Sequence, residues 1–190
     1  MNLIELERRA LDAATKIISR VQPEDLALPT PCAQWDLRAL LVHLVSENLG
    51  FADAARGGTA AASWSAGTLD PDPATAFAVS AAEVTEAFAA DGLLARPVTV
   101  PAFGVFPGEV AVKMHLIDTV AHSWDVARTL GEDWALEEDL VEAALTVALR
   151  FPMTRGPGQA FGVLVDVPQD APAPTRLLGY LGRDPEWKAP

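Results

Sequence analysis

The stretch KMHLIDTVAHSWDVA, residues 113–127, holds two of the three histidines in the chain and repeats its apolar residues at helical spacing. A helix turns by about 100° per residue, so residues three or four apart share a face. One face is apolar and carries Val110, Met114, Ile117, Ala121 and Trp124. A second face, roughly 100° away, carries Ala111, His115, Asp118, His122, Asp125 and Thr129. The pattern predicts a helix over about 109–130 with a polar stripe beside its apolar one.

The polar stripe has an unusual composition for a helix face in contact with water. It contains no Lys, Arg, Glu or Gln, which usually occupy a solvated face. The long cations Lys113 and Arg128 lie on the opposite flank of the apolar stripe. We therefore expect the polar stripe to face a small polar cavity; the alternative is an ordinary solvated face.

Spacing decides which residues of the stripe can share one metal ion. Asp118 and His122 are four residues apart, about 6 Å along the axis, and meet on one face. His115 and Asp118 are three residues apart and can also meet. His115 and His122 are separated by more than ~10 Å of rise, which is too far for two ligands about 2 Å from one ion. Asp118 belongs to both workable pairs, and spacing leaves the choice between them open.

A third ligand has to come from another helix, and His43 is the remaining histidine. It falls in a predicted helix over 37–56, at the edge of the apolar stripe, where side chains of neighbouring helices meet. That stripe consists of Leu37, Leu40, Leu41, Leu44 and Phe51. Glu47 follows His43 by one turn on the same side, so the alternative is a half-buried histidine that is hydrogen-bonded to Glu47.

The rest of the chain is also dominated by helical patterns. Apolar spacing, N-cap residues and Pro or Gly boundaries predict helices over 2–20, 37–56, 74–90, 109–130, 136–150 and 174–182. Three prolines in the segment 95–110 leave room for one short strand. We expect an all-α protein, namely a four-helix bundle with an extra helix and a short irregular C-terminal extension, in which residues 1–190 form a single domain.

The composition excludes several classes of partner. Acidic residues outnumber basic ones by 26 to 14, and the net charge of −12 argues against binding to nucleic acid or to anionic membranes. No apolar run reaches the ~18 residues of a membrane span, and the N-terminus lacks a signal-peptide pattern, so we expect a cytoplasmic protein. Cys32 is the only cysteine, which excludes an internal disulfide, and we expect a packed free thiol rather than a nucleophile.

Three motifs carry a resemblance to a known family. The stretch TPCAQWDLRALLVHLV (30–45) is followed about seventy residues later by HLIDTVAHSWDVARTLG (115–131), and PAPTRLLGYLGRDPEW (172–187) lies near the C-terminus. Together they resemble the DinB-like, mycothiol-dependent maleylpyruvate isomerase N-terminal family, and within it a small actinobacterial metal-binding branch. The resemblance implies a four-helix bundle with a divalent metal. One ligand is a histidine of the second helix, and the other two, a carboxylate or histidine and a histidine, lie four residues apart on a later helix.

Carried over by motif, these metal ligands fall on His43, Asp118 and His122. His115, Glu47 and Asp125 then become candidates for residues around the ligands, with Asp125 placed to orient an imidazole. Zinc or nickel suits two imidazoles and one carboxylate. Three protein ligands leave a coordination position open, as in catalytic rather than structural sites.

An open divalent metal can turn a bound water or thiol into a nucleophile, and the resemblance implies that the thiol is mycothiol. We therefore expect a metal- and thiol-dependent transferase, isomerase or hydrolase whose partner is a small electrophile or thiol. Full-length isomerases of the family carry a separate C-terminal domain, whereas about forty residues follow the fifth predicted helix here, so maleylpyruvate isomerisation itself is not carried over. The alternatives are a non-catalytic protein that binds a metal or small ligand, and a structural role with packed histidines and a homodimer.

Overall fold

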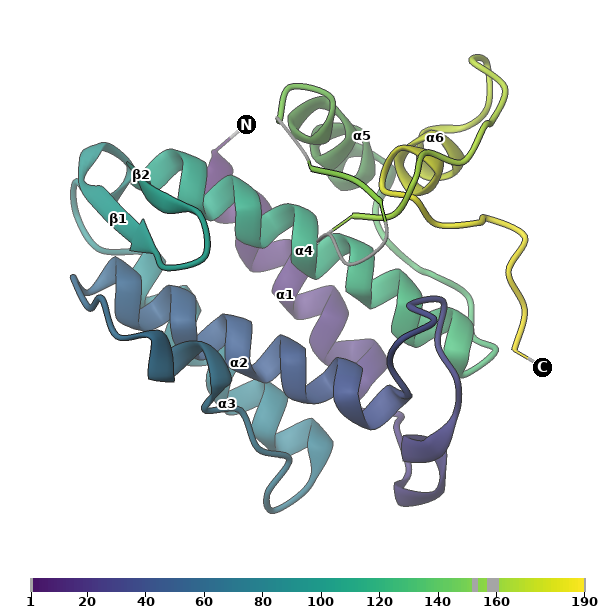
Figure 1. Cartoon of the computed structure of the whole chain (residues 1–190), viewed down its shortest axis with the longest axis horizontal. Helices are drawn as coiled ribbons and strands as arrows, with labels where there is room; N and C mark the ends of the chain where they lie inside the picture. Colours follow the sequence, from purple (N-terminus) through teal and green to yellow (C-terminus); the bar gives the residue numbers. More distant parts are fainter. Residues whose placement is uncertain (1, 152–153, 157–160, 190) are drawn as a thin grey trace.

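The protein is a bundle of helices, as the sequence predicts, with one small hairpin (Figure 1). The computed structural model describes residues 2–151, 154–156 and 161–189. Its α-helices are α1 (Leu3–Ile18), α2 (Leu37–Ala55), α3 (Pro73–Phe88), α4 (Gly108–Thr129), α5 (Glu138–Ala148) and α6 (Ala173–Tyr180). The all-α prediction is confirmed, and the helices begin and end within two residues of their expected bounds.

Helices α1, α2 and α3 each begin after a short polar side chain that caps them. Asp36 accepts a hydrogen bond from the backbone N–H of Ala39 and so caps α2, as expected. Asp72 does the same for α3 through Thr75, with Pro73 in the first helical position. Such caps satisfy backbone N–H groups that have no partner inside the helix. They hold the first turn of α2 in place, two turns before His43.

The segment between α3 and α4 differs from the prediction of one short strand. It forms an antiparallel hairpin of β1 (Pro97–Val100) and β2 (Gly104–Pro107), with Thr99 opposite Val105. Gly104 has φ of 117°, a conformation that favours glycine, and it lets the chain reverse after only three residues. Pro97 and Pro107 lie opposite each other at the outer ends of the strands, and Pro101 lies in the turn, so none of the three interrupts an inner hydrogen bond.

Helices α1 to α4 pack as a four-helix bundle in which α1 and α2 each contact both α3 and α4. The expected apolar stripe of α2 is buried in its centre: Leu37, Leu40, Leu41, Leu44 and Phe51. Burying one such side chain stabilises the fold by about 1.5–3 kcal/mol, so this stripe holds α2 in one orientation. That orientation determines where His43 points.

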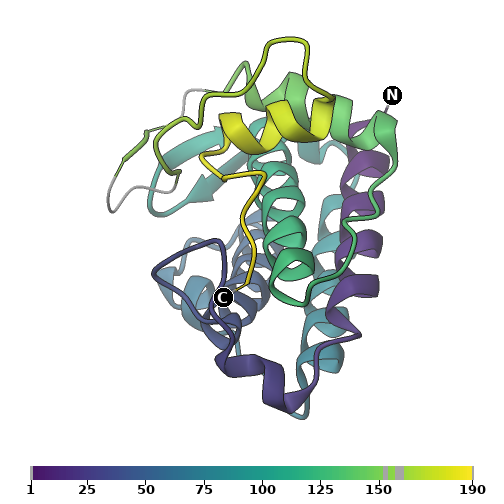
Figure 2. The ribbon, with the colours of Figure 1, turned by 90° about the vertical axis from the view of Figure 1, so that its right-hand side faces the viewer.

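Helix α4 is the most enclosed helix of the bundle, because α5 and α6 cover the side that the other helices leave free (Figures 1 and 2). Leu140 and Leu177 of these two helices join the apolar residues of α4 in a second core. The polar stripe is therefore inside the protein, and the solvated-face alternative is wrong. The expected apolar stripe is correct from Ile117 onward, whereas Val110 and Met114 are only half-buried.

Within the described residues, every helix is either too short or too polar to cross a bilayer.

Candidate metal centre

The three expected ligands lie together between α2 and α4. The Nε2 atom of His43 is 3.4 Å from Oδ2 of Asp118, and Nε2 of His122 is 3.4 Å from Oδ1 of the same carboxylate. One ligand atom from each residue lies within 4.8 Å of the other two. His43 reaches the site from α2, and the spacing of four residues on α4 places Asp118 and His122 on one face.

The arrangement fits a small divalent cation. Two ligands ~2.1 Å from a tetrahedral ion lie roughly 3.4 Å apart, which matches both distances. Among the described residues, Nε2 of His43 and Oδ2 of Asp118 are buried and have no hydrogen-bond partner. Buried polar atoms without a hydrogen-bond partner cost free energy, and a cation between these two atoms would satisfy both, so the residues fit the expected metal. Two imidazole nitrogens and a carboxylate oxygen are donors that suit zinc or nickel.

His122 is held in one orientation by Asp125, which lies one turn further along α4. Its Nδ1 atom is 2.8 Å from Oδ2 of Asp125, a carboxylate with 0% exposure. Burial by itself raises the pKa of Asp125, but the guanidinium of Arg183 at 3.0 Å and the imidazole outweigh burial and lower it to about 2. The ionised carboxylate keeps the proton of His122 on Nδ1, and Nε2 is left to face Asp118.

Arg183 and Cys32 belong to the same cluster, although neither was expected there. Arg183 follows α6, and its Nη2 atom donates to Sγ of Cys32 at 3.2 Å as well as to Asp125. The thiol of Cys32 is half-buried and lies 3.2 Å from Oδ2 of Asp125. Trp35, in the same loop, stacks against His43 with ring centroids 4.7 Å apart. The loop before α2 therefore closes one side of the centre.

Comparison with known proteins identifies the same family as the motifs on α2 and α4. The sequence model of the family described as the mycothiol maleylpyruvate isomerase N-terminal domain matches residues 7–127. The chain belongs to this family. The matched segment contains all three candidate ligands and Asp125, whereas Arg183 and α5 lie beyond it.

Two relatives and two solved structures match a longer part of the chain than the family model does. Two uncharacterized proteins of Mycobacterium tuberculosis strains are each 30% identical over 191 residues, covering 96% of this chain and 98% of theirs. Two crystal structures of a mycothiol-dependent maleylpyruvate isomerase, one of them a mutant, superpose with a TM-score of 0.62 at 16% and 14% identity. They match 78% of this chain and 68% of theirs, which shows that the family fold is shared.

Glu47 lies at the edge of the family motif on α2 and faces the ligands. Its Oε1 atom is 3.8 Å from Nδ1 of His43. Burial raises the pKa of Glu47 to about 7, and the negative charge of Asp118 adds to that effect. A cation bound between Asp118 and the histidines would lower this pKa again. Glu47 is thus a carboxyl group that can change its protonation state near neutral pH.

Both ring nitrogens of His115 contact residues other than the candidate ligands. Its Nδ1 atom is 2.6 Å from Oε1 of Glu7, and its Nε2 atom is 3.0 Å from Oδ1 of Asn48. Both partners lie on the apolar stripes of their helices, α1 and α2. A lone carboxylate on a buried stripe of α1 was the signal in the sequence that could have identified this pair.

A cavity of about 590 Å³ reaches the centre from the side of the hairpin, and both Asp118 and Glu47 line it. This gives the candidate ligands access to a small molecule, since pockets of this size hold typical ligands.

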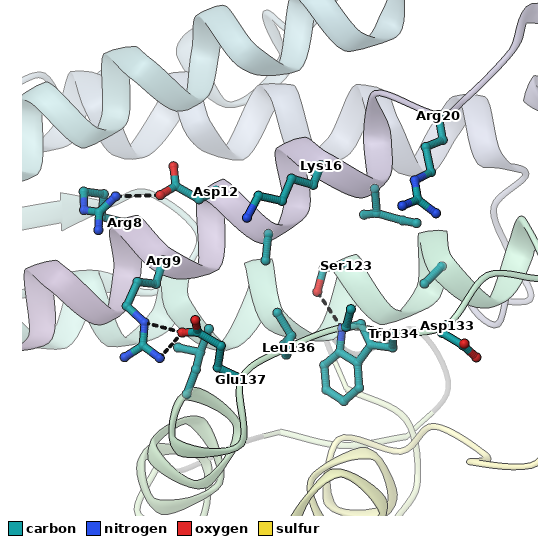
Figure 3. A pocket seen from close by; sticks show the side chains of 15 residues that line it. Arg8, Arg9, Asp12, Lys16, Arg20, Ser123, Asp133, Trp134, Leu136 and Glu137 are labelled. Carbon is teal, nitrogen blue, oxygen red and sulfur yellow. Dashed lines mark hydrogen bonds and ion pairs between the residues drawn. The ribbon is translucent and has the colours of Figure 1, made fainter.

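A second hollow of about 470 Å³ lies along α1, on another part of the molecule (Figure 3). Several cations surround it, but carboxylates already pair with them: Arg8 binds Asp12, and Arg9 binds Glu137. The indole of Trp134 is likewise engaged, because it donates to Ser123. The pair Arg9–Glu137 holds α1 to the connection before α5, and Trp134 holds the same connection to α4.

Proposed function

We propose that the protein is a metal-dependent enzyme that transfers a low-molecular-weight thiol, mycothiol, to a small electrophile, in an isomerase or S-transferase reaction. The observation that carries this proposal is the convergence of His43, Asp118 and His122 with buried atoms that lack partners, at the end of an open cavity. Membership of the mycothiol maleylpyruvate isomerase N-terminal family supports the choice of thiol.

His43, Asp118 and His122 would hold the ion, zinc or nickel, and leave a position that faces the cavity. When bound, such an ion lowers the pKa of a coordinated thiol and supplies a thiolate at neutral pH. Asp125 keeps Nε2 of His122 directed at the ion, and Arg183 keeps Asp125 ionised. The hydrogen bonds of these two residues place the imidazole before any ligand arrives.

Glu47 would handle the proton of the reaction. Its carboxylate would accept the proton of the incoming thiol, and the thiolate sulfur would add to one carbon of an activated C=C bond, whose π electron pair moves onto the conjugated carbonyl. In an S-transferase reaction the carboxyl group of Glu47 would return the proton to the adduct, or a leaving group such as chloride would depart with its electron pair. In an isomerase reaction the adduct would rotate about the new single bond and expel the thiolate again, which restores the double bond. Glu47 is placed for this exchange because it lines the cavity through which the thiol would arrive. The half-buried position beside His43 keeps the group within the site.

Elemental analysis of untagged protein tests the metal part of the proposal. We expect one divalent ion per chain in the wild type and a loss of most of it in His43→Ala, because His43 is the ligand from α2. His115→Gln is the matched control, since it removes a histidine that faces Glu7 and Asn48, and it is expected to keep the ion. A wild-type protein without stoichiometric metal would contradict the proposal.

A thiol-transfer assay tests the catalytic part. With chlorodinitrobenzene as a general electrophile, we expect conjugation to require both mycothiol and the bound ion. Glu47→Gln is expected to lower kcat while the metal content stays unchanged, because the amide cannot accept the proton of the thiol. Stoichiometric metal without any thiol transfer would show a non-catalytic binding protein instead.

A further inference from the structure

The cavity beside the metal centre has walls that indicate the class of its ligand. Its length follows α4 from Val110 to Asp118, which is about 12 Å along the helix axis. Apolar side chains of α2, α4 and the hairpin make most of the wall: Phe51, Val100, Phe103, Phe106, Met114 and Ile117. Pockets of this composition bind apolar groups, and the few polar residues orient them.

The exposed aromatic residue Phe103 also indicates an apolar ligand. Phe103, in the turn between β1 and β2, is 55% exposed although it lines the cavity. Leaving a phenylalanine ring in water is unfavourable, and a ligand that covers the ring recovers part of that free energy. A small, fully hydrated ligand would gain nothing from this ring.

The charged side chains that line the cavity can bind one anionic group of a ligand. Lys113 and Arg150 both line it, and Lys113 is already bound by Glu109 one turn earlier on α4. Among the described residues, the guanidinium of Arg150 makes no ion pair. The opposite charges in the lining, Glu47 and Asp118, belong to the metal centre. One free cation matches one carboxylate, whereas a small dianion would place a second negative charge against an apolar wall.

We propose that the electrophile bound by this enzyme is a monocarboxylic acid with a bulky apolar body, which lies along α4 with its carboxylate on Arg150. That the ligand reacts as an electrophile rests on the proposed function. Its chemical class is inferred from the walls of the cavity. The substrate class therefore differs from small dicarboxylic acids.

Calorimetry with unreactive probes tests the inference on the whole protein, without thiol or turnover. We expect octanoate to bind, hexanoate to bind about fifteenfold more weakly because it lacks two methylenes that each contribute about fourfold, and maleate to bind more weakly than either. Phe103→Ala and Arg150→Gln are each expected to weaken octanoate binding about three- to fivefold.

Two matched variants control for nonspecific effects. Val79→Ala removes another exposed apolar side chain, on α3, and Arg20→Gln removes another exposed cation, so neither is expected to change octanoate binding. Maleate binding as tight as octanoate, or octanoate binding that both Phe103→Ala and Arg150→Gln leave unchanged, would overturn the inference. These binding constants do not depend on the thiol-transfer assay, so a negative result in that assay would contradict the proposed function without contradicting this inference.

Discussion

At the scale of single residues, the orientation of His122 depends on one carboxylate that does not itself face the cavity. Asp125 is completely buried and holds Nδ1 of His122 at 2.8 Å, while Arg183 compensates its charge. Hydrogen bonds of this kind fix the tautomer of a metal-binding imidazole and raise its basicity. Their loss commonly weakens metal binding without removing a ligand.

We therefore expect Asp125→Asn to weaken binding of zinc by about 10- to 100-fold. The amide has the shape of the carboxylate but lacks the negative charge that keeps the proton of His122 on Nδ1. Competition with a chromophoric chelator measures the change in Kd. Asp12→Asn, on the exposed face of α1, is the control for a lost carboxylate, and equal affinities of the two variants would contradict the assigned role of Asp125.

At the scale of elements, a buried hydrogen-bond chain links all four helices of the bundle. Ser80 donates to the carbonyl of Phe77, so the amide of Asn48 must donate to Ser80 and turn its Oδ1 atom toward His115. His115 consequently carries a proton on Nε2, and its Nδ1 atom faces Glu7. A second proton on Nδ1 makes an imidazolium that pairs with the carboxylate of α1.

This pair makes the stability of the protein dependent on pH. Burial lowers the pKa of His115, but the charge and hydrogen bond of Glu7 outweigh burial, so the pKa is raised in the folded state. A raised pKa stabilises the fold fully below the unfolded value of about 6.5, and this stabilisation is lost as the pH rises through the folded value.

We expect urea unfolding to show a free energy of unfolding that decreases between pH 6 and pH 9 in the wild type. Glu7→Gln is expected to reduce that decrease, since the amide cannot hold the imidazolium. Glu5→Gln, which changes an exposed carboxylate on the same helix, should retain the wild-type profile. A wild-type profile in Glu7→Gln would mean that His115 is neutral across this range.

At the scale of the whole molecule, the candidate ligands join two helices that are far apart in the sequence, so binding of an ion is linked to folding and to protons. Burial favours the neutral forms of His122 and Asp118. Their mutual attraction nevertheless keeps the pKa of His122 well above and that of Asp118 well below their ordinary values. The metal-free site is thus an ion pair in which a proton takes the place of the cation.

Removal of the metal is therefore expected to lower the thermal stability, and its return to release a proton from His122. With zinc at 100 times its Kd, the free energy of unfolding should rise by about 2.7 kcal/mol. Titration calorimetry in two buffers of different ionisation enthalpy counts the released protons, and the affinity should increase with pH. Neither effect is expected in His43→Ala; zinc uptake without proton release would contradict the ion pair.

The helices, the apolar stripe of α2 and the meeting of Asp118 with His122 could be predicted from the sequence, because they depend on the 3.6-residue period and on caps only a few residues away. The choice of His43 came from the edge of that stripe and from the family motif. Each of these features is local, so it can be predicted from the sequence of a single segment. The tertiary packing does not alter them.

The surroundings of the centre depend on the tertiary structure alone. Cys32 meets Asp125 across 93 residues, Arg183 meets it across 58, and His115 meets Glu7 across 108. Helices α5 and α6 cover the apolar face of α4, while α1 brings Glu7 to His115 and the segment after α6 brings Arg183 to Asp125. Such contacts follow from how several helices pack at once, because a buried charge needs a partner from whichever element lies opposite, and periodicity within one helix carries no information about that element.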